Sequence, residues 1–485
     1  MGIKEDLIAI VGPENFSDEP EELKSYAKDS SVSLASMPAY VVKPENADEV
    51  QKIVKLSNQN KTAIVPCSSG IHFHGNTIPG QGGIVLDLRR MDRVLSVDER
   101  NRAVRFEPGV TWGQLKEELD KHDLIPLNPL LPHPLKSALS SQLEREPILA
   151  TKFEYSEPLL TMEVVLPTGD LFRTGSASVP GFPGKSASAG VYPEGPGMDW
   201  YRLFLGAQGT MGVATWVNSK VECKPKADKT FFIPFDTIED AIAPMYRIQR
   251  RMIGQECLLL NNINLATILA EKWPGDFETL KKVLPRWTLI LVVSGGWRRP
   301  DEKIAYEEAA LREIGQELSI TAPQTSIPGV PGKGKEISQV LRSPWPEGKT
   351  YWKFARKGAC QDLFFFTVMS RAPTFTKAIG EVLTKHGLSL DDVGIYVQPV
   401  ERGRVCHFEC NIFYQPDDIN EVARVRELYI TAAEVLIDMG ALFTRPYGSI
   451  ADIVYDRAAT YTTALKKMKN LLDPNEIMAP GRLCF

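Results

Sequence analysis

Apolar residues recur at helical spacing in the first part of the chain, between short apolar runs. One such stretch begins near Asn46 and places four apolar residues on a single face, Val50, Ile53, Val54 and Leu56. That spacing predicts an amphipathic helix after an opening helix and a short strand. A further helix is predicted from Thr111, because Thr111 followed by Gln114 fits a capping box.

Two apolar runs flank a loop that is rich in glycine, serine and histidine. Residues 62–67, TAIVPC, and residues 83–91, GIVLDLRRM, are predicted as strands, and the loop between them holds His72 and His74. The two histidines leave three interpretations open: a metal site, a covalent attachment point for a cofactor, or a loop that is only rich in histidine. The alternation of short strands and helices over about the first 220 residues favours an α+β or α/β domain.

The pattern changes near Lys226. Strands are predicted at residues 229–235 and 286–297, each followed by an amphipathic helix, and a second strand–helix–strand set follows. This arrangement predicts a separate α+β domain with an antiparallel sheet. Residues 461–485 predict one amphipathic helix and then an extended end.

The strand predicted at residues 404–415 separates two kinds of side chain. His407 and Glu409 fall on one face, and the other face carries Cys406, Phe408 and Cys410, because side chains alternate along a strand. The cysteine face is expected to pack in a core. His407 with Glu409 could form a proton relay or half a metal site, but two further ligands are lacking, so a hydrogen-bonded pair is favoured.

Composition and charge exclude several classes of protein. The 485 residues exceed the usual limit for one core, and 43% hydrophobic with 24% charged residues is typical of a globular protein. A formal net charge of −5 argues against a nucleic-acid binder. Charges within the first five residues and the lack of 18 consecutive apolar residues argue against a signal peptide or membrane span, so we expect a cytoplasmic protein. The seven cysteines show no CxxC spacing, and no metal site is expected.

Three glycines at three-residue spacing, Gly206, Gly209 and Gly212, precede a predicted strand. Glycine lets the backbone approach a ligand closely and present N–H groups to it. The segment is not a Rossmann fingerprint, because it leads into a strand and not into a helix. By itself it indicates either a ligand loop or a tight turn.

Several motifs in one order carry a family resemblance. They are PENADEV, a strand ending in Pro before a Gly/Ser loop, VLDL, FEPGVTWGQL, MEVVLPTGDLFRTG, FLGAQGTMGVAT and the closing LLDPNEIMAPGRL. Together they resemble the FAD-binding flavoprotein family that includes vanillyl-alcohol oxidase, 4-cresol dehydrogenase and the glycolate and D-lactate dehydrogenases. The resemblance implies an α+β fold: a two-part FAD-binding domain of the PCMH type plus an α+β cap domain with an antiparallel sheet. The implied bounds are 1–226 for the FAD-binding domain with its core at about 36–226, 227–444 for the cap, and 445–485 for a tail that completes the FAD-binding domain.

The resemblance also implies an FAD site. Its residues are Pro66, Ser68, Ser69, Gly70, Ile71, His72, Gly75, Asn76, Ser140, Ser141, Glu144, Gly209, Thr210, Gly212, Val213 and Arg482. The serines and glycines of the first loop would donate to the pyrophosphate, and His72 would add a ring N–H or a positive charge. Phe73 and His74 would pack beneath or beside the cofactor. Histidyl-flavin relatives carry their linking His where Ile71 stands, so non-covalent FAD is expected, and linkage through the cap domain stays open.

On the substrate side, residues 140–146 and 403–418 resemble the vanillyl-alcohol oxidase and 4-cresol dehydrogenase branch, and the Gly-rich loop at 206–212 is closer to the glycolate and lactate branch. The first branch implies Glu154 or Tyr155 near the flavin and Arg445 at the substrate's oxyanion. Thr444 replaces that branch's phenolate-binding Tyr, so Tyr447 is a candidate substitute. His407 completes the candidate catalytic residues.

These observations predict an FAD-dependent dehydrogenase. It would move hydride from an alcohol, or an activated benzylic or allylic C–H, of a small substrate that could be aromatic. A 2-hydroxy-acid dehydrogenase and a non-catalytic FAD-binding electron-relay subunit remain alternatives. A partner protein that accepts electrons and assembly into a homo-oligomer are compatible with these functions. No nucleic acid is expected as a partner.

Overall fold

The computed structural model describes residues 2–153, 157–179 and 190–485. The strands of its first sheet all lie in the N-terminal quarter of the chain. The order is β1 (Phe16–Ser17), β2 (Tyr40–Val42), β4 (Ile84–Asp87) and β3 (Ile64–Cys67). Strands β3 and β4 are parallel neighbours, so the chain must return along the sheet between them. It does so in residues 68–83, the Gly/Ser/His loop, which forms no helix or strand among the described residues.

The second sheet is antiparallel and follows directly in the chain. Its order is β5 (Val94–Asp98), β6 (Ala103–Phe106), β10 (Val213–Cys223), β8 (Leu159–Val165) and β9 (Leu171–Arg173), with β7 (Leu124–Pro126) also on β10. The helices of this half are α1 (Ile3–Val11), α2 (Pro20–Tyr26), α3 (Ala47–Asn60), α4 (Trp112–Asp120) and α5 (Ala138–Leu143). Asn46 caps α3, and the capping box of Thr111 and Gln114 starts α4; both predictions are confirmed.

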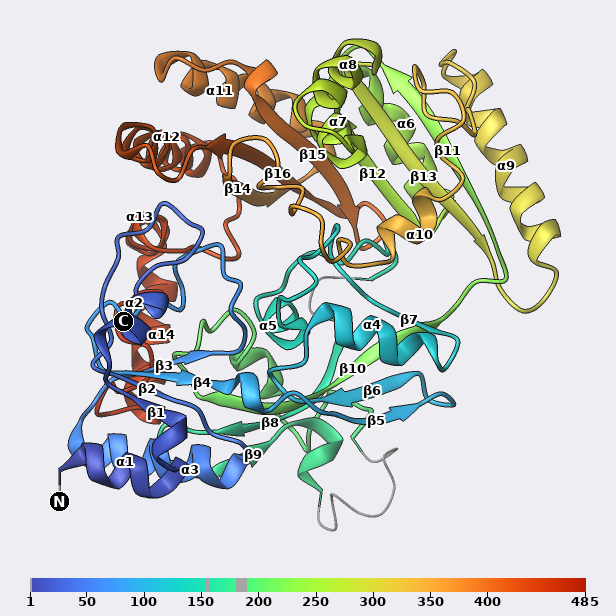
Figure 1. Cartoon of the computed structure of the whole chain (residues 1–485). Helices are drawn as coiled ribbons and strands as arrows, with labels where there is room; N and C mark the ends of the chain where they lie inside the picture. Colours follow the sequence, from blue (N-terminus) through green and yellow to red (C-terminus); the bar gives the residue numbers. More distant parts are fainter. Residues whose placement is uncertain (1, 154–156, 180–189) are drawn as a thin grey trace.

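The third sheet confirms the predicted antiparallel α+β unit (Figure 1). Its order is β11 (Ala227–Phe235), β13 (Trp287–Gly295), β12 (Glu256–Asn261), β15 (Val393–Val400), β16 (Val405–Tyr414) and β14 (Ala359–Thr367). Every neighbouring pair runs antiparallel. The strands are buried on both faces because helices and loops cover each side.

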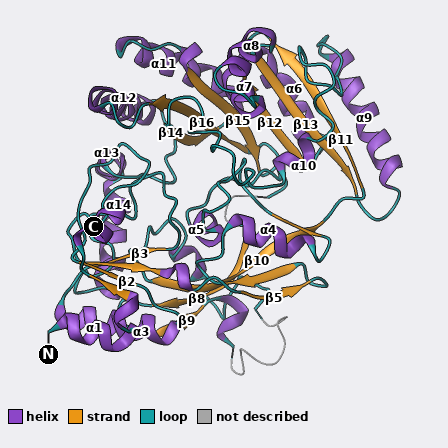
Figure 2. Cartoon of the chain, viewed as in Figure 1, coloured by secondary structure: helices purple, strands orange, loops and turns teal. Residues whose placement is uncertain are grey.

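Alternation along these strands sorts the side chains between two cores. Leu289 and Leu291 face a core shared with α6 (Ile238–Arg250), α9 (Pro300–Glu317), α11 (Ala372–Lys385) and α12 (Ile419–Asp438). Ile290 and Val292 face a core shared with α7 (Asn262–Leu269), α8 (Gly275–Val283), α10 (Ile337–Leu341) and loop residues of the first half such as Phe73. Figure 2 shows this sheet set apart from the first two, with its helices around it. The second face therefore meets the N-terminal half.

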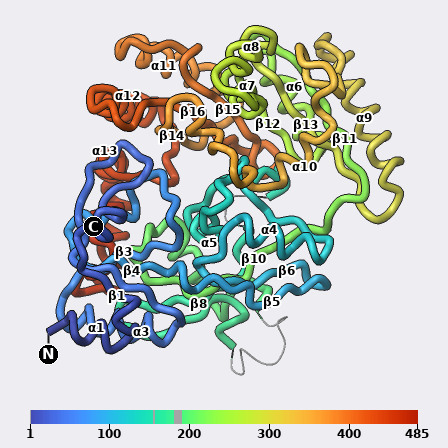
Figure 3. Tube along the Cα trace, viewed as in Figure 1, coloured from blue at the N-terminus to red at the C-terminus, as the bar shows by residue number. Residues whose placement is uncertain are grey.

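The C-terminal segment returns to the first sheet. After α13 (Ser449–Arg457) and α14 (Ala459–Leu472), the Ile64 backbone N–H donates to Ile477 O over 2.7 Å, and the Ala479 N–H donates to Ile64 O over 2.8 Å. Figure 3 shows the red end of the chain beside the blue N-terminal strands. The tail therefore packs on the N-terminal half, although the whole third sheet separates the two in sequence. No helix of the described residues is long and apolar enough to cross a membrane.

Candidate active site

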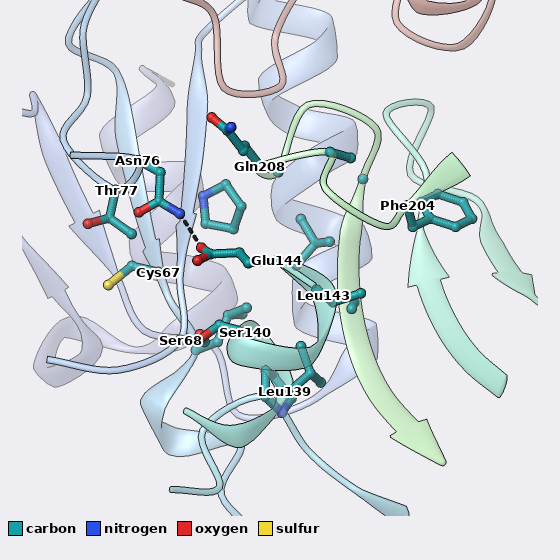
Figure 4. A pocket seen from close by; sticks show the side chains of 18 of the residues that line it. Cys67, Ser68, Asn76, Thr77, Leu139, Ser140, Leu143, Glu144, Phe204 and Gln208 are labelled. Carbon is teal, nitrogen blue, oxygen red and sulfur yellow. Dashed lines mark hydrogen bonds between the residues drawn. The ribbon is translucent and has the colours of Figure 1, made fainter. Parts of the chain in front are cut away.

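A cleft lies between the loop after β3, helix α5 and the Gly-rich loop before β10 (Figure 4). Nine of the residues predicted to bind the cofactor line it: Pro66, Ser68, His72, Asn76, Ser140, Glu144, Gly209, Gly212 and Val213. Thr77 and Gln208 add polar side chains, and Leu139, Leu143 and Phe204 add an apolar wall. The cleft thus combines hydroxyl and amide groups with apolar surface.

Four other predicted residues build the frame of this cleft without lining it. The Ser69 hydroxyl donates to Ile71 O over 3.1 Å, and Ile71 packs against the core on the second face of the third sheet. The Ser141 hydroxyl accepts from Trp112 Nε1 over 3.0 Å, and the Thr210 hydroxyl donates to Ala207 O over 2.7 Å. These contacts fix the backbone that carries the lining residues.

Gly70, Gly75 and Arg482 also lie outside the lining. Arg482 Nε donates to Asn76 O over 3.2 Å, and its guanidinium also contacts Ile78 O. The Gly75 N–H donates to the half-buried Asp29 carboxylate over 2.6 Å. Gly75 has a φ of +76°, which a residue with a Cβ rarely adopts. The end of the loop is therefore held from the C-terminal segment.

Of the two contributions expected from His72, a ring N–H or a positive charge, its lowered pKa favours the ring N–H. Burial lowers the pKa of His72 to about 4, although its hydrogen bond with Ser69 O, at 2.5 Å, favours the charged form. A neutral imidazole keeps the ring N–H for Ser69 O and offers no charge near pH 7. His72 therefore lines the cleft as a neutral side chain. Its Nε2 lies 3.2 Å from Cys67 Sγ.

Glu144 connects the cleft to the chain segment around Tyr447, which follows the third sheet. One carboxylate oxygen accepts from the Tyr447 hydroxyl over 3.0 Å, and the other accepts from the Asn76 amide, drawn as a dashed line in Figure 4. Burial raises the pKa of Glu144 above its ordinary value, against the effect of Lys136. The carboxylate is held by two neutral donors from distant parts of the chain.

The residues of the cleft fit FAD. In the described part of the chain, the backbone N–H groups of Ser68, Ser69 and Gly70 donate to no protein acceptor, which leaves them for phosphate oxygens. A Cβ at Gly209 would lie 2.7 Å from Pro66 Cγ, so the two ligand loops approach as closely as glycine allows. The apolar wall suits the flat rings of a dinucleotide, and the hydroxyls suit its ribityl chain and phosphates.

A second, buried cavity lies where the third sheet meets the N-terminal half, and we call it the inner cavity. Its charged lining residues are Lys136 and Glu146 from the N-terminal half, Lys353, Asp362 and Glu409 from the third-sheet unit, and Arg445. Its volume of about 50 Å³ suits only a small ligand, since one water needs roughly 10–15 Å³.

The carboxylates of the inner cavity are engaged by lysines. Lys353 Nζ donates to Asp362 over 2.6 Å and to Glu409 over 2.7 Å. Glu409 also accepts from the Tyr396 hydroxyl, His407 Nε2 and Asn411 Nδ2 at 2.7–3.0 Å. Burial would raise the pKa of Glu409, but Lys353 and the His407 hydrogen bond hold it well below its ordinary value. Lys136 pairs with Glu146 in the same way.

Arg445 is the exception among these cations. Its guanidinium carbon lies 3.9 Å from the centroid of the Phe364 ring, and the side chain is 5% exposed. Among the described residues it makes no hydrogen bond, and its buried Nε has no partner. Burial opposes its charge, but Tyr447, Glu146 and Glu409 raise the pKa of Arg445 above the ordinary value. A buried guanidinium with free N–H groups is a ready site for an oxyanion.

The structure places the other predicted catalytic residues as follows. His407 is fully buried behind Glu409, and the predicted hydrogen bond between them is confirmed at 3.0 Å. The opposite face, with Cys406 and Cys410, packs in the first core of the third sheet, as predicted. Glu154 and Tyr155 lie outside the described residues. No group of three or more His, Cys, Asp or Glu side chains suited to a metal occurs in the described ranges.

Comparisons with known proteins match this geometry. The family model of an FAD binding domain matches residues 38–175. Glycolate oxidase subunit GlcD of Bacillus subtilis is 26% identical over 99% of this chain and 96% of its own. The 4-cresol dehydrogenase flavoprotein subunit of Pseudomonas putida is 23% identical over 98% of this chain and 93% of its own.

The fold agrees with a solved structure of p-cresol methylhydroxylase with substrate bound. The TM-score is 0.86 at 20% identity, over 100% of this chain and 96% of that one. The protein is an FAD-dependent oxidoreductase with the fold of p-cresol methylhydroxylase (PCMH). The predicted PCMH-type fold and the FAD cofactor of this oxidoreductase are thereby confirmed.

Sequence reasoning missed part of the oxidoreductase's inner cavity. Asp362 stands in the apolar run CQDLFFF, and a carboxylate within a buried strand is a signal that could have found it. Lys136 and Lys353 lie in irregular segments, where no period predicts the direction of a side chain. Only the packing of the third sheet on the N-terminal half brings them together.

Proposed function

We propose that this oxidoreductase is a dehydrogenase of a small substrate that carries a carboxylate or a phenolate. The oxidised atom would be an alcohol carbon or an activated C–H carbon. It would lie next to the anionic group or be attached directly to an aromatic ring. The observation that carries this proposal is Arg445, a buried cation on the inner cavity with no carboxylate hydrogen bond among the described residues.

Bound FAD supplies an acceptor for a hydride from carbon. The chain's own residues bind and orient the substrate. Arg445 would grip the oxyanion through two N–H groups, and Phe364 would fix the plane of the guanidinium. The mostly buried walls of the inner cavity would limit the access of water and strengthen that ion pair. Ser68, Asn76 and Ser140, on the cleft, would hold the cofactor.

A 2-hydroxy acid is the second candidate substrate. A guanidinium binds a carboxylate as well as a phenolate, and the inner cavity is small. The similarity to glycolate oxidase subunit GlcD along nearly the whole chain supports this candidate. The similarity to the 4-cresol dehydrogenase flavoprotein subunit supports the aryl substrate and also an electron-accepting partner subunit.

The proposed activity is tested by mixing the FAD-loaded protein anaerobically with three sets of compounds: aryl alcohols, 4-alkylphenols and 2-hydroxy acids. Bleaching of the oxidised flavin by one set supports a dehydrogenase and names its substrate class. Matched esters or ethers, which lack the anionic group, should bleach the flavin far more slowly. A flavin that stays yellow with every compound rejects the dehydrogenase and favours an electron-relay subunit.

A further inference from the structure

His74 separates the inner cavity from a third cavity, which we call the outer cavity. The outer cavity has a volume of about 450 Å³ and is lined by residues 31–36, helix α12 and the C-terminal segment around Tyr447. Leu34 on its wall is 74% exposed, so this cavity reaches solvent. The His74 side chain lines both cavities and is 8% exposed.

In the described part of the chain, the imidazole of His74 is held only by ring contacts. It stacks on Tyr447 with centroids 4.6 Å apart and an interplanar angle of 13°, and it meets the edge of Phe364 at 5.4 Å. Among the described residues, neither ring nitrogen makes a hydrogen bond, and Nδ1 is buried without a partner. A neutral imidazole has one donor and one acceptor nitrogen, so His74 keeps a lone pair for another group.

The other candidate bases on the inner cavity are already engaged. Glu409 accepts four hydrogen bonds, which fills the acceptor sites of a carboxylate. Asp362 is bound by Lys353 and by Asn411. His133 uses Nδ1 to accept from the Leu135 N–H over 3.2 Å. Lys136 lowers the pKa of Glu146 despite burial, which weakens it as a base.

We propose that His74 is the base that removes the hydroxyl proton of an alcohol substrate and passes it to the outer cavity. The proposal rests on the dehydrogenase function above. Bound FAD would supply the acceptor for the hydride from the C–H carbon, and as that C–H bond breaks the O–H proton would move to His74. The C=O bond forms from the oxygen's electron pair, and the imidazolium then gives its proton to water in the outer cavity.

The charges around His74 make its basicity depend on the bound ligand. Burial has the largest effect and lowers the pKa of His74, and the charges of Lys136, Arg445 and Lys353 lower it further, to well below 6.5. Glu409 acts in the opposite direction and raises it. The two cavities further bring titratable or charged groups around it, namely Tyr447, Tyr351, Tyr396, His133, Asp362, Glu146, Arg426, Tyr429 and Arg482. An anion on Arg445 would cancel one of the opposing cations and raise the pKa of His74. Below that raised pKa, ligand binding is coupled to proton uptake; above it, His74 stays neutral and can accept the hydroxyl proton.

Binding of benzoate to the FAD-loaded protein tests this coupling without turnover. The dissociation constant would be measured from the shift in flavin absorbance between pH 6 and 8, where benzoate itself stays ionised. A ligand that raises a pKa binds more tightly as pH falls, by up to about tenfold per pH unit. We expect this slope in the wild type and no slope in H74Q or H74F, of which H74F keeps the stacked ring. H133Q, a matched histidine variant on the same cavity, should keep the slope.

A second measurement follows flavin reduction by an alcohol that bleaches the wild type. H74F should slow this reduction by roughly 10²–10⁴-fold with FAD content unchanged. An unchanged binding slope and reduction rate in H74F would overturn the role of His74 while leaving the dehydrogenase intact. If no alcohol bleaches the wild type, the dehydrogenase function is rejected and the role of His74 falls with it.

Discussion

The Tyr447 hydroxyl donates to Glu144 across 3.0 Å, and Glu144 in turn accepts from Asn76 on the cofactor loop. This contact joins the C-terminal segment, the end of helix α5 and the Gly/Ser/His loop between the cleft and the outer cavity. It couples cofactor binding to the wall that carries His74, because Tyr447 is also the ring on which His74 stacks.

Replacing Glu144 with Ala should weaken both stability and FAD retention. The change leaves the Tyr447 hydroxyl and the Asn76 amide without their acceptor, at about 1–3 kcal/mol. Urea unfolding and the FAD content after gel filtration measure the two effects. Y447F removes a single hydrogen bond and keeps the stacked ring, so it should lower the stability less than E144A does. An E144A protein as stable as the wild type would contradict the stabilising role of Glu144 between Tyr447 and Asn76.

Replacing Arg445 with Gln should remove the preference for anionic ligands. A hydrogen bond to a charged group contributes about 1.5–3 kcal/mol, so benzoate should bind roughly ten- to hundredfold more weakly. Benzyl alcohol, of similar shape but uncharged, serves as the control ligand and should lose little. Equal losses for both ligands would mean that Arg445 only supports the fold.

Lys469 should be essential for holding the Gly-rich loop against the C-terminal segment. Its buried Nζ donates to Thr210 O at 2.8 Å, Met478 O at 2.9 Å and Asp473 at 2.6 Å. Breaking a buried ion pair by removing one partner costs about 3–5 kcal/mol, so K469M should unfold at lower urea and lose FAD. K469M/D473N removes both charges and should be more stable than K469M. A double variant less stable than K469M would refute the ion-pair account.

Acid should loosen the cofactor loop through His72. The folded-state pKa of His72 is lowered to about 4 from an ordinary 6.5 by burial, so the unfolded chain binds more protons between these values. Stability is therefore complete above about pH 6.5 and falls as pH drops toward 4. FAD release followed by flavin fluorescence should rise in this window. H72N should flatten that part of the profile, and an identical profile in H72N would exclude His72 as the cause.

Acid denaturation should release the FAD completely. Ile71 carries no atom that can bond to the flavin, and it packs against the second core of the third sheet. Trichloroacetic acid precipitation followed by absorbance of the supernatant measures the released flavin. Yellow colour that stays with the pelleted protein would point to a link through another residue.

The local elements were largely predictable from sequence, because they depend on spacing. The helix that begins near Asn46 and the two faces of the strand around His407 follow from periods of 3.6 and 2, and the capping box at Thr111 follows from the residue types three positions apart. The family motifs further predicted a set of cofactor-binding residues, since the loops that carry them are continuous stretches of chain. Nine of the predicted residues line the cleft.

The inner cavity was not predictable in the same way. Lys136 and Lys353 are 217 positions apart in the sequence, and each lies in an irregular segment. The sequence places His74 in the cofactor loop, but no local pattern shows that its side chain lines both the inner and the outer cavity. The neutral state of His72 likewise depends on burial, which no local pattern contains.

The sequence by itself determined the helices, the strands, their buried faces and the nature of the cofactor, because short-range spacing and continuous loops encode them. The tertiary structure alone decided which charges meet, which are paired and which are left free. The physical reason is that pairing and desolvation arise when the third sheet packs on the N-terminal half. That packing leaves Arg445 without a carboxylate hydrogen bond and His74 with a free lone pair within the described chain.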